Sequence, residues 1–303
     1  MTMLKPTRRH FLAGITGGAV ALASPRALWA SAASAPAIGV QLYMLKQSLA
    51  DDFGGTLHAV AALGVKNLEF AGYYDQPAAG MKVALADYGL NAVSSHCLMA
   101  SMSDDKAKEA IDYGAELGLK TVVAAIPYMR LLGECRTWDE AMRGVSRDDF
   151  LHSAERFNRF GELANAAGLV FAYHNHAFDF TKFGGEYGLD ILLSNTDENL
   201  VKFQLDVGNT AMAGIDPLAY FAQHSSRVPS VHMKDWKKPM TPSLYDMPEP
   251  TPVGSGVLDL PALVAALAKA GVAHMYIEQE NMPRELELVA LAANVDNLGA
   301  LGA

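Results

Sequence analysis

Short runs of apolar and β-branched residues recur along the chain, and each is followed by a longer stretch in which apolar positions are spaced differently. The runs are four to seven residues long, the length expected for strands buried in a parallel sheet. Eight strands are therefore expected, at Ile38–Tyr43, Lys66–Phe70, Ala92–His96, Thr121–Ile126, Leu169–His174, Val201–Val207, Ser230–Met233 and Met275–Glu278.

Between most of these runs, apolar residues lie three and four positions apart, as on one face of an α-helix. Several of these stretches end in a glycine, a typical helix stop before a turn into the next strand. The expected helices are Thr56–Leu63, Ala107–Leu117, Asp149–Ala167, Pro261–Ala270 and a last one near Arg284–Leu298. Eight strand–helix units in about 265 residues predict a single α/β domain, a closed (β/α)8 TIM barrel. No G-x-G-x-x-G motif follows the first strand, which argues against a dinucleotide-binding fold.

Two segments interrupt this rhythm, Pro127–Ser146 after the fourth strand and Asp235–Ser255 after the seventh. Both are long and contain Pro, Met and aromatic residues. Because both follow the carboxyl ends of strands, where barrel enzymes build their pockets, we expect pocket walls or lids. Ordinary surface insertions are the alternative.

Ionisable side chains stand at the carboxyl ends of six of the predicted strands, positions that meet at one mouth of a barrel. A single histidine there is weak evidence, but a set of charged groups at one mouth is costly unless something pairs or coordinates them. Mixed acid, imidazole and amide groups suit a divalent ion such as Mn²⁺, Zn²⁺, Mg²⁺ or Co²⁺. The ionisable side chains at or just after the six strand ends are Glu69, His96, His174, His176, Asp206, His232, Lys234, Asp235, Glu278 and Glu280.

The first 35 residues have the order of a bacterial twin-arginine export signal. Arg8 and Arg9 precede a short Gly/Ala-rich apolar run, and small-residue cleavage patterns follow at 30–32 and 33–35. We therefore expect residues 1–35 to be a signal and its flank, residues 36–303 to form the barrel, and the mature protein to be periplasmic. The apolar run is shorter than the roughly 20 residues of a membrane span, and no other run approaches that length.

Removing this segment takes four basic residues away and changes the formal net charge from −9 to about −13. An acidic surface repels phosphate backbones, so a nucleic-acid partner is not expected. The chain has two cysteines, Cys97 and Cys135, too few for a disulfide-stabilised scaffold. Whether they form a bridge is left open by the sequence.

At these motifs the sequence resembles the xylose isomerase-like TIM barrels, often called sugar phosphate isomerases/epimerases, of the AP endonuclease family 2 superfamily. The resemblance covers essentially the whole mature chain, and its motifs are specific for the superfamily but not for one substrate. The matching stretches are 39–43, 68–74, 173–176, 205–209, 231–235, 252–257 and 276–280.

The resemblance implies a metal held by an acid after strand five, an aspartate on strand six, a histidine on strand seven and a glutamate on strand eight. Asp206, His232 and Glu278 match the last three of these positions. His174 stands where many relatives have the acid, so His174 is the expected fourth ligand, with His176 as the alternative. The missing acid weakens an epimerase mechanism that needs two carboxylates, whereas an imidazole can still bind metal and act as a base.

These groups predict a mechanism in which the metal binds two neighbouring substrate oxygens and polarises a carbonyl. Glu278, His174 or His176 would then remove a carbon-bound proton to give an enediolate, with Lys234 facing the developing charge. The expected substrate-binding side chains are Glu69, His96 and Gln41, and Glu69 or His96 can also supply a leaving-group proton. A solvated lysine at the barrel rim is the alternative for Lys234.

The leading functional hypothesis is therefore a divalent-metal-dependent isomerase or epimerase of a sugar or keto-sugar. A lyase or dehydratase of 3-keto-glycosides or inosose-like substrates is the runner-up. Export favours an unphosphorylated substrate, and no phosphate-cradling Gly-rich loop precedes a helix. A nuclease like endonuclease IV, disfavoured by the acidic charge, and a sugar-binding barrel without a metal are further alternatives; homo-oligomerisation is left open.

Overall fold

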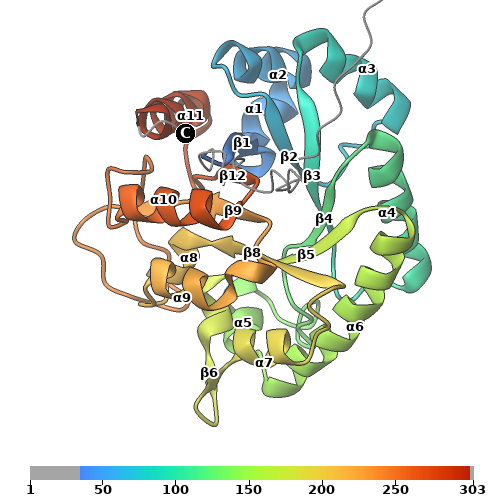
Figure 1. Ribbon diagram of the computed structural model, residues 1–303, viewed down its shortest axis with the longest axis vertical. Coiled ribbons are helices and arrows are strands. Elements are labelled where there is room, and N and C mark those ends of the chain that lie inside the picture. Colours follow the sequence, from blue (N-terminus) through green and yellow to red (C-terminus); the bar gives the residue numbers. More distant parts are fainter. Residues whose placement is uncertain (1–34, 301–303) are drawn as a thin grey trace, which may run out of the picture. The chain divides into compact units, whose positions relative to one another are not determined.

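The computed structural model describes residues 35–300. Eight parallel strands close into a barrel, and helices surround it (Figure 1). In chain order these strands are β1 (Ala37–Gln41), β2 (Asn67–Ala71), β3 (Asn91–Leu98), β4 (Thr121–Ala124), β5 (Val170–His174), β8 (Val201–Asp206), β9 (Ser230–Met233) and β12 (His274–Ile277). Each pairs with its neighbour in the chain, and β12 closes the ring against β1. The predicted TIM barrel is confirmed, and all eight predicted strands end within two residues of the observed bounds.

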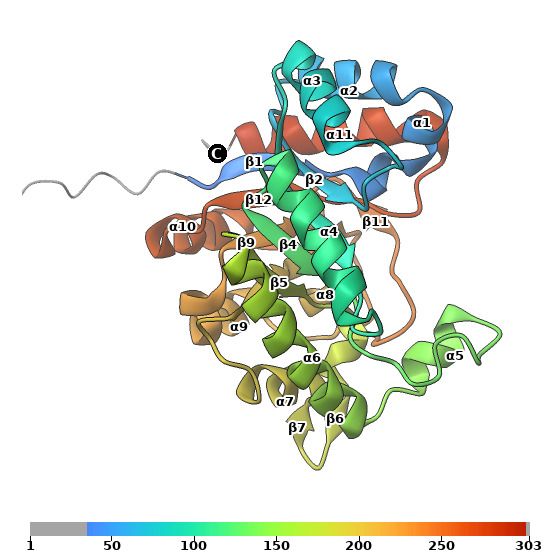
Figure 2. The same ribbon diagram turned by 90° about the vertical axis from the view of Figure 1, so that its right-hand side faces the viewer.

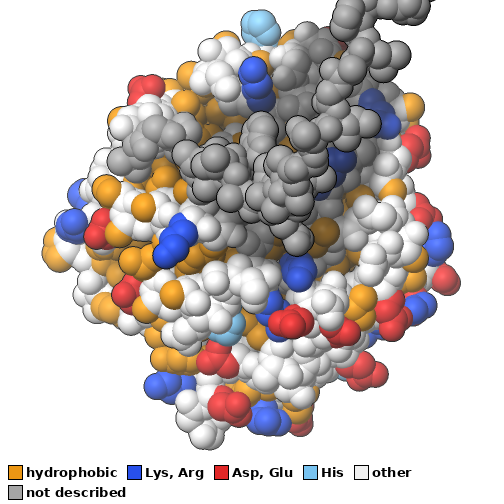
Figure 3. Space-filling model, viewed as in Figure 1, with side chains coloured by type: hydrophobic (Ala, Val, Ile, Leu, Met, Phe, Trp, Pro, Cys, Tyr) orange, Lys and Arg blue, Asp and Glu red, His pale blue; other side chains and the backbone are white. Residues whose placement is uncertain are grey.

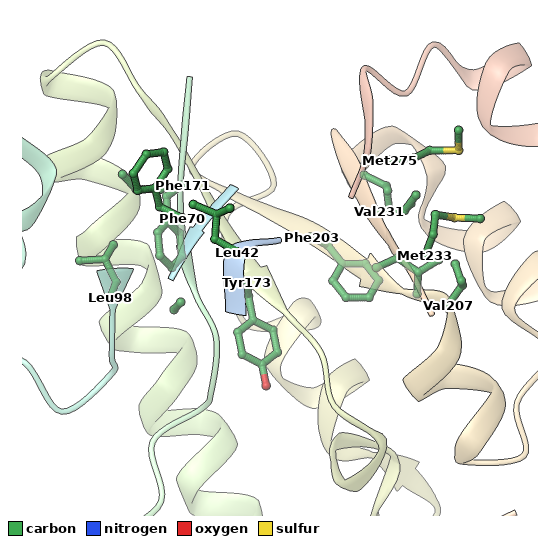
Figure 4. Close-up of a cluster of buried hydrophobic side chains, with 14 of the residues drawn as sticks. Leu42, Phe70, Leu98, Phe171, Tyr173, Phe203, Val207, Val231, Met233 and Met275 are labelled. Atoms are coloured by element: carbon green, nitrogen blue, oxygen red, sulfur yellow. The ribbon is translucent and has the colours of Figure 1, made fainter. Parts of the chain in front are cut away.

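Side chains alternate along every strand between the inside of the barrel and the helices outside it, as the two-residue period of a strand requires. On β5, Phe171 and Tyr173 pack against Phe157 of α6 (Arg147–Ala166). Figure 4 shows these two side chains together with Val231 and Met233 of β9. The apolar half of each strand therefore builds the core between sheet and helices, which leaves the other half free for polar groups.

The helices that cover the barrel begin and end close to the predicted bounds. Those predicted are α2 (Phe53–Ala62), α4 (Asp104–Leu117), α6, α10 (Leu260–Ala270) and α11 (Arg284–Gly299). The glycines expected to stop the first four, at positions 64, 118, 168 and 271, all have positive φ angles. The other helices were not predicted: α1 (Lys46–Asp51), α3 (Ala78–Tyr88), α5 (Trp138–Arg143), α7 (Gly188–Ser194), α8 (Val207–Met212) and α9 (Pro217–His224).

The two long segments have structure of their own. The first contains α5, which stands away from the barrel strands in Figure 2. The second begins and ends in an antiparallel pair, β10 (Asp235–Trp236) with β11 (Pro250–Thr251). A second small pair joins β6 (Lys182–Phe183) to β7 (Glu186–Tyr187). Three 3-10 turns complete the described elements, η1 (Leu42–Leu45), η2 (Ala177–Phe180) and η3 (Ser225–Arg227).

The described residues allow the expectations about surface charge, the two cysteines and membrane-spanning helices to be compared with the structure. Basic and acidic side chains lie interspersed on the face shown in Figure 3, without a large patch of one sign. Cys97 and Cys135 are both free thiols. Among residues 35–300, no helix has both the length and the apolar character needed to cross a membrane. The predicted export signal lies outside the described residues.

Candidate functional site

Polar side chains fill the inside of the barrel toward the carboxyl ends of its strands. They take the inward positions of the alternation, opposite the apolar residues that face the helices. Most of them are buried, and they contact one another across the barrel. This inner set comprises Gln41, Glu69, His96, His174, Gln204, Asp206 and His232, extended by Lys234 and Glu278 just beyond β9 and β12.

The four predicted metal ligands lie together in this set. One donor atom from each of His174, Asp206, His232 and Glu278 falls within 4.8 Å of the other three, and all four residues are buried. Nε2 of His174 is 3.8 Å from Oδ2 of Asp206, and Nδ1 of His232 is 2.9 Å from Oε2 of Glu278. Donor atoms that each lie about 2.1 Å from one ion are at most about 4.2 Å apart. A small contraction of the cluster would therefore suffice to surround a divalent ion.

The chemistry of these residues fits a metal ion. Burial, reinforced by nearby imidazoles and Lys234, lowers the pKa of His174 well below its usual range, so its ring is neutral and has a lone pair to donate. Nδ1 of His174 is buried and has no hydrogen-bond partner among the described residues. The carboxylate of Asp206 is fixed by donors from Asn209, with backbone N at 2.7 Å and Nδ2 at 2.9 Å. Two imidazoles and two carboxylates form a donor set suited to a borderline divalent ion.

Glu69 contacts Nε2 of His232, the ring nitrogen that faces away from Glu278. Its Oε1 lies 2.5 Å from Nε2 of His232 and 3.1 Å from Nε2 of His96, and it accepts a hydrogen bond from Gln41. Oε2 accepts a hydrogen bond from Gln204 at 2.6 Å. Burial opposes the charge on Glu69, but His96 and His232 outweigh it and hold the pKa of this carboxyl well below its usual range. Burial likewise opposes protonation of His232, yet Glu69 and Glu278 raise the pKa of His232 to about 10, so without metal this ring is an imidazolium. A metal ion bound at Nδ1 would have to displace that proton.

Lys234 is buried beside the carboxylates rather than solvated at the rim. Its Nζ lies 3.2 Å from Oδ2 of Asp206, 3.1 Å from Oε2 of Glu278 and 2.5 Å from Oε1 of Glu280. Burial opposes its charge, but these three acids raise the pKa of Lys234 well above its usual range, so the side chain is an ammonium. Lys234 and a metal ion would thus share the oxygens of Asp206 and Glu278.

A cavity of about 710 Å³ reaches this cluster at His174 and Glu278. Its polar lining comes from His96, His174, His176, Asn209, Glu278, Glu280 and Asn281. Its apolar lining includes residues of both long segments, Trp138 and Met142 from the first and Leu244, Tyr245 and Met247 from the second. The expectation that these segments form pocket walls is confirmed.

The predicted site residues divide into two groups by their relation to this cavity. His96, His174, His176 and Glu278 line it, so these side chains can meet a substrate. The others are buried and do not line it: Gln41, Glu69, Asp206, His232 and Lys234. The hydrogen bonds of Glu69 indicate a role in orienting His232 and His96. The substrate-binding roles of Glu69 and Gln41 stay predictions.

His176 and Glu278 are the cavity-lining groups best placed to accept a proton. Burial and the charge of Lys234 hold the pKa of His176 below its usual range, so its imidazole is neutral. Burial opposes ionisation of Glu278, but Lys234 and His232 outweigh it and lower the pKa of Glu278, so it is a carboxylate. Both groups are therefore in the basic form that proton abstraction requires.

Sequence reasoning missed several residues that shape the site. Asn209 lines the cavity and fixes Asp206, and it was visible only as part of a matching stretch. Gln204 bridges Glu69 and His96, with Oε1 2.8 Å from Nε2 of His96. Its position two residues before Asp206 on β8, on the same face of the strand, was the available signal.

The chain is similar in sequence and in structure to known barrel proteins. The family model described as Xylose isomerase-like TIM barrel matches residues 57–296. An inosose dehydratase from Clostridium beijerinckii is 28% identical over 190 residues, which make up 60% of this chain and 63% of that relative. This chain thus spans less than two thirds of the length of that protein.

Two longer matches agree with the family model. An inosose dehydratase from Geobacillus thermodenitrificans is 24% identical over 254 residues, 76% of this chain and 83% of that protein. Among solved structures, a sugar phosphate isomerase/epimerase from Parabacteroides distasonis is similar with a TM-score of 0.71 and 27% identity, over 89% of this chain and 96% of that one.

Proposed function

Because this chain belongs to the xylose isomerase-like TIM barrel family, we propose that it is an enzyme that removes the proton next to a carbonyl of a sugar-like substrate. A group on the neighbouring carbon then leaves, which makes the enzyme a dehydratase or lyase. The observation that carries the proposal is a cavity lined by His174 and Glu278, whose donor atoms cluster with those of Asp206 and His232 behind them. The similarity to two inosose dehydratases supports elimination.

We assign the metal to those same four residues. His174 and Asp206 come from β5 and β8, and His232 and Glu278 come from β9 and the end of β12. A divalent ion bound there would act as a Lewis acid on the substrate carbonyl. The nearby Glu69 would keep the ring of His232 in the orientation that directs Nδ1 to the cluster, as carboxylates commonly do for metal-binding histidines.

Different side chains would accept the proton, stabilise the negative charge and protonate the leaving oxygen. The carboxylate of Glu278 or the neutral ring of His176 accepts the proton from carbon. Lys234 does not line the cavity, but its ammonium lies 3.1 Å from Oε2 of Glu278 and would stabilise negative charge on the substrate from behind that carboxylate. His96 lines the cavity, lies 3.1 Å from Glu69, and would supply the proton that the leaving oxygen needs.

An isomerase or epimerase is the second candidate, and it shares the first proton transfer. The similarity to the Parabacteroides distasonis sugar phosphate isomerase/epimerase favours it. The strand-five position favours elimination, because His174 stands where many relatives carry the acid that would move a proton on the second face of the substrate.

A single reaction mixture separates the two candidates. The protein is incubated with an inosose, or with a 3-keto-glycoside, in D₂O with added Mn²⁺, and absorbance and deuterium content are followed. Elimination predicts a new ultraviolet absorption from a carbon–carbon double bond conjugated to the carbonyl, and Glu278→Gln should slow it at least 100-fold. Deuterium in a stereoisomer of the substrate without that absorption would assign the protein to the isomerases.

We also propose that the twin-arginine segment exports the folded protein to the periplasm. Arg8 and Arg9 carry this proposal. Replacing both by lysine should leave the protein in the cytoplasmic fraction of expressing cells. An unchanged periplasmic fraction would refute this route.

A further inference from the structure

The proposed chemistry uses only the polar part of the cavity lining, and much of the remaining lining is apolar. One group of large side chains in it comes from the two long segments and from η1, whereas the polar lining comes mainly from strand ends. This group, called the apolar wall, consists of Tyr43, Trp138, Met142, Leu244, Tyr245 and Met247.

Several of these side chains are more exposed than large apolar residues usually are. Tyr43 is 43% exposed, Trp138 43% and Met247 39%. Of the nine large apolar side chains exposed in residues 35–300, these three line the same cavity. Apolar surface gathered at the mouth of a polar site is typical of a ligand-binding wall rather than of scattered surface residues.

The two segments are tied to each other at this wall. The guanidinium of Arg143 on α5 lies over the ring of Tyr245, 4.3 Å from its centre. The same guanidinium pairs with Asp139 at 2.8 Å and reaches Asp246 of the second segment at 3.4 Å. These exposed contacts are individually weak, but together they hold two segments about 100 residues apart as one surface.

The size of the cavity fits a substrate with two parts. A volume of about 710 Å³ lies in the range that holds drug-sized ligands, and it exceeds what one six-membered polyol ring needs. A polyol ring matches the polar lining, because its hydroxyl and carbonyl oxygens find imidazole, amide and carboxylate partners there. It leaves the apolar wall without a matching surface.

We propose that this wall binds the leaving group of a keto-glycoside, an apolar and preferably aromatic alcohol joined to the sugar. This inference rests on the proposed function and names its substrate class. The aromatic and methionine side chains suit a flat apolar group, since rings and thioethers pack well against aromatic faces.

The reaction balances without a further reagent. The base takes the proton from the carbon between the ketone and the anomeric carbon, and the electrons of that C–H bond become the new carbon–carbon double bond. The bond from the anomeric carbon to the glycosidic oxygen breaks, its electron pair stays on that oxygen, and the oxygen takes up one proton. The products are an unsaturated keto-sugar and the free alcohol. An oxidation of a glycoside hydroxyl must supply the ketone beforehand.

Turnover of two matched substrates tests the inference. Benzyl and methyl 3-keto-glucosides release alcohols of closely similar acidity, so a difference between them reports binding of the apolar group and not bond reactivity. The benzyl compound should have a KM at least tenfold lower. Trp138→Ala and Met247→Ala should each reduce that preference about three- to tenfold. Leu286→Ala removes an apolar side chain that is 41% exposed outside the cavity, and this control should leave the preference unchanged.

A binding measurement separates failure of this inference from failure of the proposed function. The unoxidised benzyl and methyl glucosides, which cannot undergo the elimination, are titrated into the protein by calorimetry. Tighter binding of the benzyl compound, weakened by Trp138→Ala, supports the apolar subsite even if neither keto-glucoside is consumed, in which case only the proposed function fails. Equal binding and equal KM values for the two glucosides overturn the subsite.

Discussion

The carboxylate of Glu69 contacts side chains from four other strands, Gln41 on β1, His96 on β3, Gln204 on β8 and His232 on β9. It does not line the cavity, so its influence on substrate must pass through these partners. The nearest of them is His232, whose other ring nitrogen faces Glu278. Glu69 is therefore a positioning residue for the four-residue cluster to which we assign the metal.

Glu69→Gln should weaken binding of Mn²⁺ or Zn²⁺ by about 10- to 100-fold, because an amide orients His232 less strongly than a carboxylate. Titration calorimetry of the chelator-treated protein measures this, with circular dichroism to show that the barrel is intact. Glu116→Gln changes an exposed glutamate on α4 and serves as the control. A folded Glu69→Gln protein with unchanged affinity would contradict the assigned role.

Asp179 provides a residue-scale test of stability against pH. Burial raises its pKa from 3.8 to about 7, although hydrogen bonds from Tyr173 and the backbone of His176 oppose the shift. Between about pH 4 and pH 7 the folded protein thus holds a proton that the unfolded chain has released. The free energy of unfolding falls as the pH rises through this window.

Asp179→Asn should abolish that loss, because an amide does not titrate. From pH 5 to pH 8, the free energy of unfolding of the variant should improve relative to the original protein by about 1–3 kcal/mol. Urea denaturation at both pH values measures the difference. Parallel pH dependences of the two proteins would refute the assignment.

At the scale of elements, the segment from β10 to α10 is anchored by one carboxylate. Asp235 accepts hydrogen bonds from the backbone N–H groups of its neighbour Trp236 and of four residues at 254, 256, 257 and 258, at 2.8–3.2 Å. A Cβ at Gly256 would lie only 2.4 Å from Oδ1 of Asp235, so glycine is required there. This explains why the stretches 231–235 and 252–257 stand out together in the sequence.

Asp235→Ala should lower the free energy of unfolding by about 2–4 kcal/mol, since several buried N–H groups lose their acceptor. It should also speed proteolytic cleavage within 237–249, the segment that carries Leu244 and Met247. Asp87→Ala, at an exposed position of α3, is the control and should change neither measurement. Unchanged stability and cleavage in the Asp235 variant would show that the segment is held by other contacts.

The sequence predicted the elements that depend on local pattern. The eight strands and five of the helices have a clear period, so their positions were found within a few residues, whereas α3, which is as long as α10, was missed. The helix α5 and the β10–β11 pair were missed. The partners of β10 are about 15 residues away, and α5 spans only Trp138–Arg143, too short for a visible period.

At the scale of the whole molecule, closure of the barrel brings together side chains more than 100 residues apart. His174 and Glu278 belong to β5 and to the end of β12, yet both contribute donor atoms to one cluster. The resemblance to the family predicted this set from the motifs that match at the strand ends. It did not predict that Lys234 contacts the carboxylate oxygens of Asp206 and Glu278, or that Glu69 contacts Nε2 of His232. Those contacts depend on side-chain directions across the barrel.

The central claim is that these convergent groups bind one divalent ion, and metal content tests it most directly. Chelator-treated protein is reloaded with Mn²⁺ or Zn²⁺, desalted and analysed by elemental mass spectrometry, alongside Asp206→Asn and His232→Ala with unchanged circular dichroism. The account predicts about one ion per chain in the original protein and less than about a tenth of that in either variant. Full metal content in both variants would contradict it.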